Sequence, residues 1–198
     1  MESVVLMVEE TRGEAVIEAC KQGDREAFRC LFERHKDRVY SVAFYFFGGD
    51  EATAADVTQQ VFLKLFTCIR QFRGESEFTT WLYRLTTNAC VDEQRKRRRV
   101  QQFGEDELSV PGAGRTQEER LARAEVARSV KHAVAALKPK LRVVMLLKYF
   151  EELSYEEIAG VLGLSRGTVA SRLNRGHKAL ARRLGHLRGG LVRDEREG

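Results

Sequence analysis

The chain has little of what marks β-sheets and breaks in helices. Among its 198 residues there are only two prolines, Pro111 and Pro139, and alternation of apolar and polar residues over the length of a strand is scarce. Apolar residues recur instead every three to four positions, which is the spacing of one face of an α-helix. We therefore predict an all-α fold.

Groupings of residues that carry catalysis or hold metals are also missing. The four cysteines, Cys20, Cys30, Cys68 and Cys90, form no CxxC pair and have no histidine nearby at metal-ligand spacing. The four histidines are dispersed, and the sequence has neither a carboxylate cluster nor a Gly-rich phosphate loop. We expect reduced, mostly buried thiols, and we expect no enzyme activity, metal or cofactor.

Long hydrophobic runs are absent as well. No apolar run reaches the roughly 18 residues that a membrane helix needs. The first residues, MESVVLMVEE, lack the basic start and the cleavage site of a secretory signal. The sequence therefore predicts a cytoplasmic protein that does not insert directly into a membrane.

Charge, in contrast, is plentiful and unevenly placed. Charged residues make up 32% of the chain, and the formal net charge is +5. Five consecutive basic residues stand at Arg95–Arg99, and no acidic residue occurs from Ser165 to Arg193 although the chain holds 29 of them. Clustered positive charge of this kind indicates a polyanionic partner.

A change of composition divides the chain into two parts. Residues 101–117, QQFGEDELSVPGAGRTQ, contain three glycines and one proline with little periodicity, which is typical of a linker. We predict a helical domain over residues 12–100, a flexible linker over 101–117 and a second helical domain over 118–187. Within the first domain, Asp24 and Asp50 are predicted helix N-caps, and residues 72–77 are a predicted loop.

The second domain carries the pattern of a helix-turn-helix. Ser154 and Glu157 form an S-x-x-E capping box, Gly163 supplies a permissive backbone for the turn, and Ser165 caps the second helix. Val169 is expected to face inward. The second helix should then point five polar residues outward: Arg166, Ser171, Arg172, Asn174 and Arg175. Arg and Asn read base edges and Arg and Lys bind phosphates, although a basic solvated face on an ordinary helical hairpin is the alternative.

The basic run at Arg95–Arg99 follows a stretch rich in aromatic residues. Basic charge beside exposed aromatic rings suits single-stranded nucleic acid, whose bases stack or are flipped out. For Trp81 a place in the hydrophobic core is the preferred interpretation, whereas the basic run favours nucleic acid over a merely solvated helix end. The run itself is predicted to have no packing role.

Three segments, in this order, resemble a bacterial sigma factor of the sigma-70 family, extracytoplasmic-function (ECF) group. They are DEATAADVTQQVFLKLF, FRGESEFTTWLYRLTTNACVDEQRKRRR and LSYEEIAGVLGLSRGTVASRLNRGHKAL. The resemblance covers residues 20–183 and implies the second and fourth sigma domains. Two positions depart from the family pattern: Gln60 stands where an acidic residue is usual, and Thr87 stands where Arg is more usual.

The resemblance also implies sites. The surface that grips the clamp helices of the polymerase β′ subunit would comprise Asp56, Gln59, Gln60, Val61 and Phe62. The reader of the −10 element, which captures a flipped base as the duplex opens, would comprise Phe72, Arg73, Asn88, Asp92, Arg95, Lys96, Arg97, Arg98 and Arg99. The reader of the −35 element would comprise Ser165, Arg166, Thr168, Ser171, Arg172, Arg175 and Lys178.

The expected function is therefore promoter-specific initiation by core RNA polymerase. The implied partners are the β′ clamp helices, the β flap, double- and single-stranded promoter DNA and an anti-sigma factor. Two other interpretations stay open: a helix-turn-helix regulator that binds DNA as a dimer without polymerase, and a scaffold whose charge is unrelated to DNA. The scaffold leaves the two separate basic regions unexplained.

Overall fold

The computed structural model describes residues 13–101 and 118–185, and this part of the chain is helical without strands, as predicted. The linker predicted over 101–117 lies outside the described residues except for Gln101, which ends a helix. A first helix covers residues 13–21. The others are α2 (Arg25–Phe46), α3 (Glu51–Cys68), the 3₁₀ turn η1 (Ile69–Gln71), α4 (Phe78–Gln101), α5 (Glu118–Ala135), α6 (Pro139–Tyr149), α7 (Tyr155–Leu162) and α8 (Arg166–Arg183).

The predicted helix starts are confirmed. The Asp24 carboxylate accepts hydrogen bonds from the first-turn amides of α2, and the Asp50 carboxylate accepts one from the backbone N–H of Thr53 in α3. Gly48 and Gly49 make the turn between these helices with φ of 69° and 93°, which side chains other than glycine rarely adopt. These local signals set where α2 ends and α3 begins.

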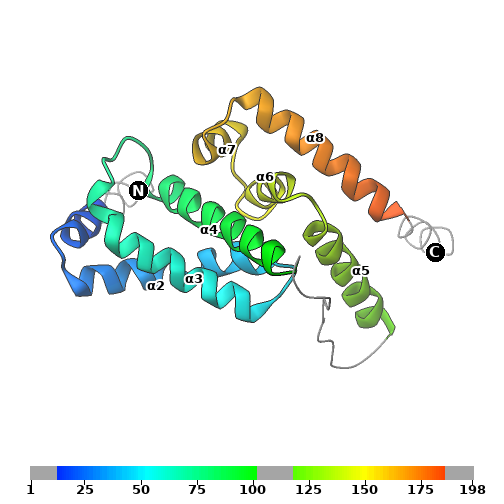
Figure 1. Cartoon of the computed structure of the whole chain (residues 1–198), viewed down its shortest axis with the longest axis horizontal. Helices are drawn as coiled ribbons and strands as arrows, with labels where there is room; N and C mark the ends of the chain where they lie inside the picture. Colours follow the sequence, from blue (N-terminus) through cyan, green and yellow to red (C-terminus); the bar gives the residue numbers. More distant parts are fainter. Residues whose placement is uncertain (1–12, 102–117, 186–198) are drawn as a thin grey trace, which may run out of the picture.

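Helices α2, α3 and α4 pack around one core (Figure 1). Each helix presents apolar side chains at intervals of three or four residues, and each of these stripes faces the other two helices. The fully buried members include Val39, Ala43, Phe46, Val57, Leu65 and Cys90.

Helices α7 and α8 form the predicted helix-turn-helix, and α6 packs against both of them. Ser154 and Glu157 make both hydrogen bonds of the capping box, and Gly163 ends α7 in the left-handed conformation at φ 62°. Val169 of α8 is buried, as predicted, together with Leu173 of the same helix and Ile158 of α7.

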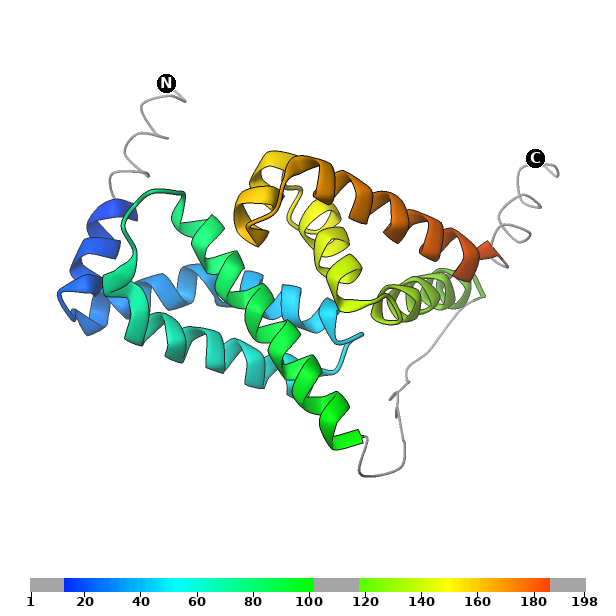
Figure 2. The ribbon, with the colours of Figure 1, turned by 45° about the horizontal axis from the view of Figure 1, so that its top comes forward.

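The two groups of helices are in contact with each other. Helix α6 lies between α4 and α8, and α7 packs on α4 (Figure 2). Helices α5 and α6 both contact α2. The contact therefore joins residues before position 102 to residues after position 117.

The burial of His35 in the first group of helices makes the stability of the fold depend on pH. Its ring lies on α2 against the ring of Phe78, 5.4 Å between centroids. Burial, with the positive charges of Arg34 and Arg38, lowers the pKa of His35 from 6.5 to about 4. The unfolded chain therefore binds this proton at a higher pH than the folded chain does. The stability that the buried neutral ring of His35 gives the fold is lost as the pH falls from about 6.5 to about 4.

We expect the H35Q variant to lose less stability than the parent chain over that pH range. Urea unfolding at a series of pH values measures the difference, and the exposed His177 changed to Gln serves as the control. Parallel curves for H35Q and the parent would contradict the buried neutral state of His35.

Candidate nucleic-acid interface and docking groove

Helix α8 presents a basic face, and its first turn is held by an N-cap and an ion pair. The Ser165 hydroxyl accepts from the backbone N–H of Thr168 and lies 2.9 Å from the Thr168 hydroxyl, so both side chains serve the N-cap. Arg166 forms an ion pair of 3.0 Å with Glu156 of α7. Ser171, Arg175 and Lys178 are exposed, whereas Arg172 is half-buried.

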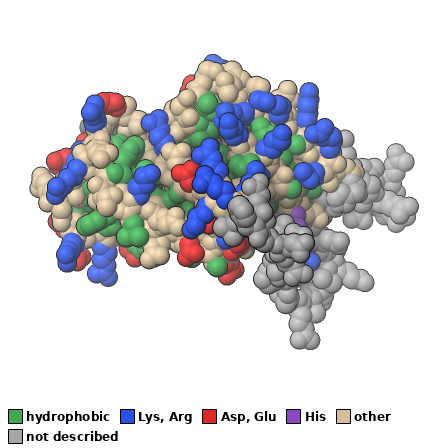
Figure 3. Space-filling model, viewed as in Figure 1, with side chains coloured by type: hydrophobic (Ala, Val, Ile, Leu, Met, Phe, Trp, Pro, Cys, Tyr) green, Lys and Arg blue, Asp and Glu red, His purple; other side chains and the backbone are tan. Residues whose placement is uncertain are grey.

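Several cations on this face are available for a partner. Within the described part of the chain, Arg172, Arg175 and Lys178 form no ion pair. The Arg175 Nε donates only to the Ser171 carbonyl of its own helix, at 3.3 Å. Figure 3 shows the Lys and Arg side chains gathered over α8. The prediction that this face binds phosphates and reads base edges therefore has unpaired cations to rest on, and it stays a prediction.

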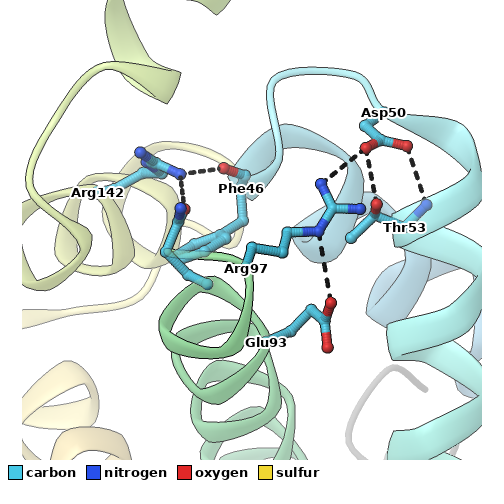
Figure 4. A network of polar contacts seen from close by, with 7 residues as sticks. Phe46, Asp50, Thr53, Glu93, Arg97 and Arg142 are labelled. Carbon is cyan, nitrogen blue, oxygen red and sulfur yellow. Dashed lines mark hydrogen bonds and ion pairs between the residues drawn. The ribbon is translucent and has the colours of Figure 1, made fainter. Parts of the chain in front are cut away.

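The basic end of α4 is not uniformly free. Arg97 lies between two carboxylates, 3.0 Å from Asp50 and 3.4 Å from Glu93 (Figure 4). Its guanidinium also covers the ring of Phe47 at 5.4 Å. Although burial acts to raise the pKa of Asp50, hydrogen bonds from Thr53 and Arg97 hold it below its usual value.

The prediction that the basic run has no packing role is therefore wrong for Arg97. Glu93 lies one helical turn before Arg97 on the same face of α4. Asp50, the N-cap of α3, lies against that face and pairs with Arg97. Arg95 pairs with Asp92 at an exposed site, where such pairs are weak, and Lys96 lies 3.9 Å from the half-buried Glu93.

Arg98 and Arg99 remain available to bind phosphates. Both side chains are exposed, and neither forms an ion pair among residues 13–101 and 118–185. They lie at the C-terminal end of α4, one to two residues beyond the paired Arg97.

The loop before α4 and the face of α4 carry the other predicted −10 residues. Phe72 is half-buried, with its ring 5.3 Å from that of Trp81, while Arg73 is exposed in the loop. Asn88 and Asp92 are exposed one turn apart on α4. Thr87 is buried and donates to the Tyr83 carbonyl, so its position faces the core.

The predicted docking helix α3 presents a different face from the one expected. Asp56, Gln59 and Gln60 are exposed, but Val61 and Phe62 are only 1% and 4% exposed. Their assignment as apolar side chains offered to a partner is therefore corrected: both pack in the core, and only part of the Phe62 ring borders the surface. Val61 and Phe62 are buried because α3 packs against both α2 and α4.

The apolar side chains that α3 does expose are Leu63 and Phe66, at 61% and 53%. They border a groove of about 580 Å³ between α2 and α3. Figure 3 shows hydrophobic side chains at the surface over this part of the molecule. The groove is lined mainly by Phe28, Phe32, Tyr40, Gln59, Phe62, Leu63 and Phe66.

Sequence reasoning missed Leu63 and Phe66, although a signal was present. The two residues follow Gln59 at four and seven positions, which is the spacing of one helix face. An apolar groove with a polar edge at Gln59 and Asp37 is typical of a surface that takes a partner helix.

Other kinds of site find little support in the described residues. Over residues 13–101 and 118–185, no three His, Cys, Asp or Glu side chains gather as a metal site requires. No helix of that part is long and apolar enough to cross a membrane. The Cys90 thiol is fully buried, and this burial raises its pKa to about 12.

Comparisons with known proteins match both groups of helices to one family. The family described as Sigma-70 region 2 matches residues 31–100, and the one described as Sigma-70, region 4 matches residues 127–180. The chain is 30% identical to the ECF RNA polymerase sigma factor SigW of Bacillus subtilis over 180 residues, 86% of this chain and 96% of SigW. It is 34% identical to the ECF RNA polymerase sigma factor SigE of Mycolicibacterium smegmatis over 177 residues, 87% of this chain and 67% of SigE.

A solved structure gives the same result at the level of the fold. The structure of CnrH in complex with the cytosolic domain of CnrY matches with a TM-score of 0.65 and 26% identity, over 87% of this chain and 96% of that one. The chain belongs to the sigma-70 family of RNA polymerase sigma factors, in its extracytoplasmic-function group.

Proposed function

We propose that this chain binds core RNA polymerase and directs it to promoters by recognising a −10 and a −35 element. The observation that carries the proposal is that one chain holds three surfaces suited to these tasks. They are the apolar groove between α2 and α3, the basic end of α4 and the basic face of α8. The chain acts by binding alone, in the cytoplasm where polymerase works, and is not an enzyme.

The groove is the proposed docking surface for the β′ clamp helices. Its apolar walls and polar edge suit an amphipathic helix laid along α3. Gln59 and Asp37 supply the polar edge of the groove, and Asp56 and Gln60 are exposed nearby on α3. Leu63 and Phe66 supply the apolar contacts in place of the buried Val61 and Phe62. The domain that contains α8 is the proposed contact of the β flap.

The two basic surfaces divide the recognition of promoter DNA. Helix α8 is the proposed reader of the duplex −35 element, because Arg172 and Arg175 stand on its outer face one turn apart. The loop with Phe72 and Arg73 and the face with Asn88 are proposed to bind the −10 element as it opens. Arg98 and Arg99 are proposed to hold phosphates.

A regulatory partner is proposed for the same chain. The solved structure of CnrH contains the cytosolic domain of a second protein, CnrY. An anti-sigma factor that occupied the α2–α3 groove would compete with polymerase for the apolar side chains exposed there. This partner would therefore restrain initiation without touching DNA.

Run-off transcription with purified core polymerase on genomic fragments tests the proposal. We expect specific transcripts with core plus this protein and none with core alone. Binding of a palindromic duplex by a dimer of the protein, without any effect on core, would instead support the helix-turn-helix regulator.

A further inference from the structure

One ion pair joins the first turns of α7 and α8. Arg166 opens α8 directly after its N-cap Ser165, and its Nη1 lies 3.0 Å from the Glu156 carboxylate of α7. Both side chains are mostly exposed, 73% for Arg166 and 61% for Glu156. Exposed ion pairs of this kind contribute little to folding. We therefore look for the effect of this pair in the binding of DNA rather than in the stability of the fold.

Glu156 differs from its neighbour Glu157 in the helix that it serves. The Glu157 carboxylate accepts from the backbone N–H of Ser154 and completes the capping box of α7. The contact found for the Glu156 carboxylate among the described residues is with α8 instead. It places a negative charge beside a helix that has no acidic residue of its own and over which Lys and Arg side chains gather (Figure 3).

The geometry of the pair leaves half of the Arg166 guanidinium free. A guanidinium carries five N–H donors in a rigid fork, and here Nη1 faces Glu156. The edge formed by Nε and the other terminal nitrogen remains available. Two donors side by side match the O6 and N7 acceptors of a guanine in the major groove. Arg166 can therefore keep Glu156 as its partner while it reads a base.

The same pair weakens the attraction of Arg166 for phosphates. Phosphates attract cations at every sequence and carry no sequence information. Because Glu156 neutralises the charge of Arg166, this place on α8 gains little from the DNA backbone alone. Arg166 then contributes to binding mainly where a base edge meets its free donors. A partner that weakens binding to wrong sequences raises specificity without adding a contact to the right one.

We propose that Glu156 is a positioning residue that determines specificity for the −35 element. It directs the Arg166 guanidinium to a base edge and withholds its charge from phosphates. This inference rests on the proposed function, in which α8 reads the −35 element. It adds to the predicted reader a residue of α7 that is not on the recognition helix.

The test is a double-mutant cycle of E156Q and R166M in reconstituted holoenzyme. Affinity is measured over a salt series for a promoter that run-off transcription identifies and for a copy with a scrambled −35 element. E156Q removes the charge and keeps the size of the side chain. It should raise the affinity for the scrambled promoter about 5- to 10-fold and that for the matched promoter much less, because Arg166 becomes free to bind phosphate. The slope of log affinity against log salt for the scrambled promoter should steepen by roughly 0.7–0.9.

The cycle also shows whether Glu156 acts through Arg166. R166M should lower the preference for the matched promoter by about 5-fold or more, because a base contact is lost. In the R166M background, E156Q should change both affinities equally and leave the preference as it is. The matched control is E26Q, which breaks an exposed ion pair with Arg29 on α2 and changes the net charge by the same amount.

An unchanged preference in E156Q, or the same effect in E26Q, would overturn the inference. So would a loss of preference that E156Q still causes in the R166M background. A lower thermal midpoint in E156Q, with weaker binding to both promoters alike, would mean that the pair only supports the fold. A parent holoenzyme that does not distinguish the two promoters would contradict the proposed function itself.

Discussion

Replacing Leu63 and Phe66 together with alanine will weaken binding to core polymerase by about 30-fold or more, which is the effect of losing one hot spot of about 2 kcal/mol. Both side chains are more than half exposed on the rim of the α2–α3 groove. Their loss costs the free protein little packing apart from the edge contact of Phe66 with Phe28. Affinity for core, measured by fluorescence titration, should therefore fall while the thermal midpoint changes by a few degrees.

The neighbouring F62A variant will lose folding stability instead, although part of the Phe62 ring also borders the groove. Phe62 is buried against the ring of Phe32, 4.7 Å between centroids, so truncation leaves a cavity in the core. Such a change costs about 3–5 kcal/mol of folding free energy. For a chain of this size that lowers the thermal midpoint by about 6–20 °C.

The pair of variants separates a docking surface from a core. Lys64, exposed on α3 but not lining the groove, provides the control variant K64A. Equal loss of core affinity in K64A and in the Leu63/Phe66 variant would mean that the groove is not the site of docking. A stable F62A protein would mean that the packing of α3 is misassigned.

Phe62 is buried and Phe66 is exposed, and the sequence did not predict this difference. The caps at Asp24, Asp50, Ser154 and Ser165 were predictable because each depends on residues within one turn of the helix. Which apolar side chains of α3 are buried depends instead on where α2 and α4 lie. Residues 61–66 hold five apolar side chains, and the sequence alone does not say which of them face a neighbour.

Arg97 and the contact between the domains were beyond prediction for the same reason. The Asp50 partner of Arg97 is 47 residues away, and the Glu151 partner of Tyr83 is 68 residues away. No periodicity along one helix reveals such pairs. A run of five basic residues therefore looked uniform in the sequence, while the structure separates Arg97, which packs, from Arg98 and Arg99, which do not.

That separation leads to a prediction about the two ways in which the protein meets DNA. R172A or R175A should lower the preference of the holoenzyme for the cognate −35 element over a scrambled one. A side chain that reads a base edge contributes about 1–3 kcal/mol of discrimination, which is roughly 5- to 150-fold. Arg175 is exposed on α8 and Arg172 is half-buried three residues before it, on the side where the duplex would lie.

The double variant R98A/R99A should instead weaken binding about equally for all promoter sequences, because phosphates carry no sequence information. It should also make the slope of log affinity against log salt shallower by roughly 0.7–0.9 for each contact removed. R97A is the matched comparison from the same run. It breaks the ion pairs with Asp50 and Glu93, so we expect a lower thermal midpoint and little change in the salt slope.

The measurement is the affinity of reconstituted holoenzyme for matched and scrambled promoters over a series of salt concentrations. An altered sequence preference in R98A/R99A, with only the salt slope altered in R172A and R175A, would exchange the roles of α4 and α8. The same salt slope in R97A as in R98A/R99A would mean that polymerase binding releases Arg97 from Asp50. In that case the ion pair seen here belongs to the free protein, and Arg97 joins the phosphate contacts only in the complex.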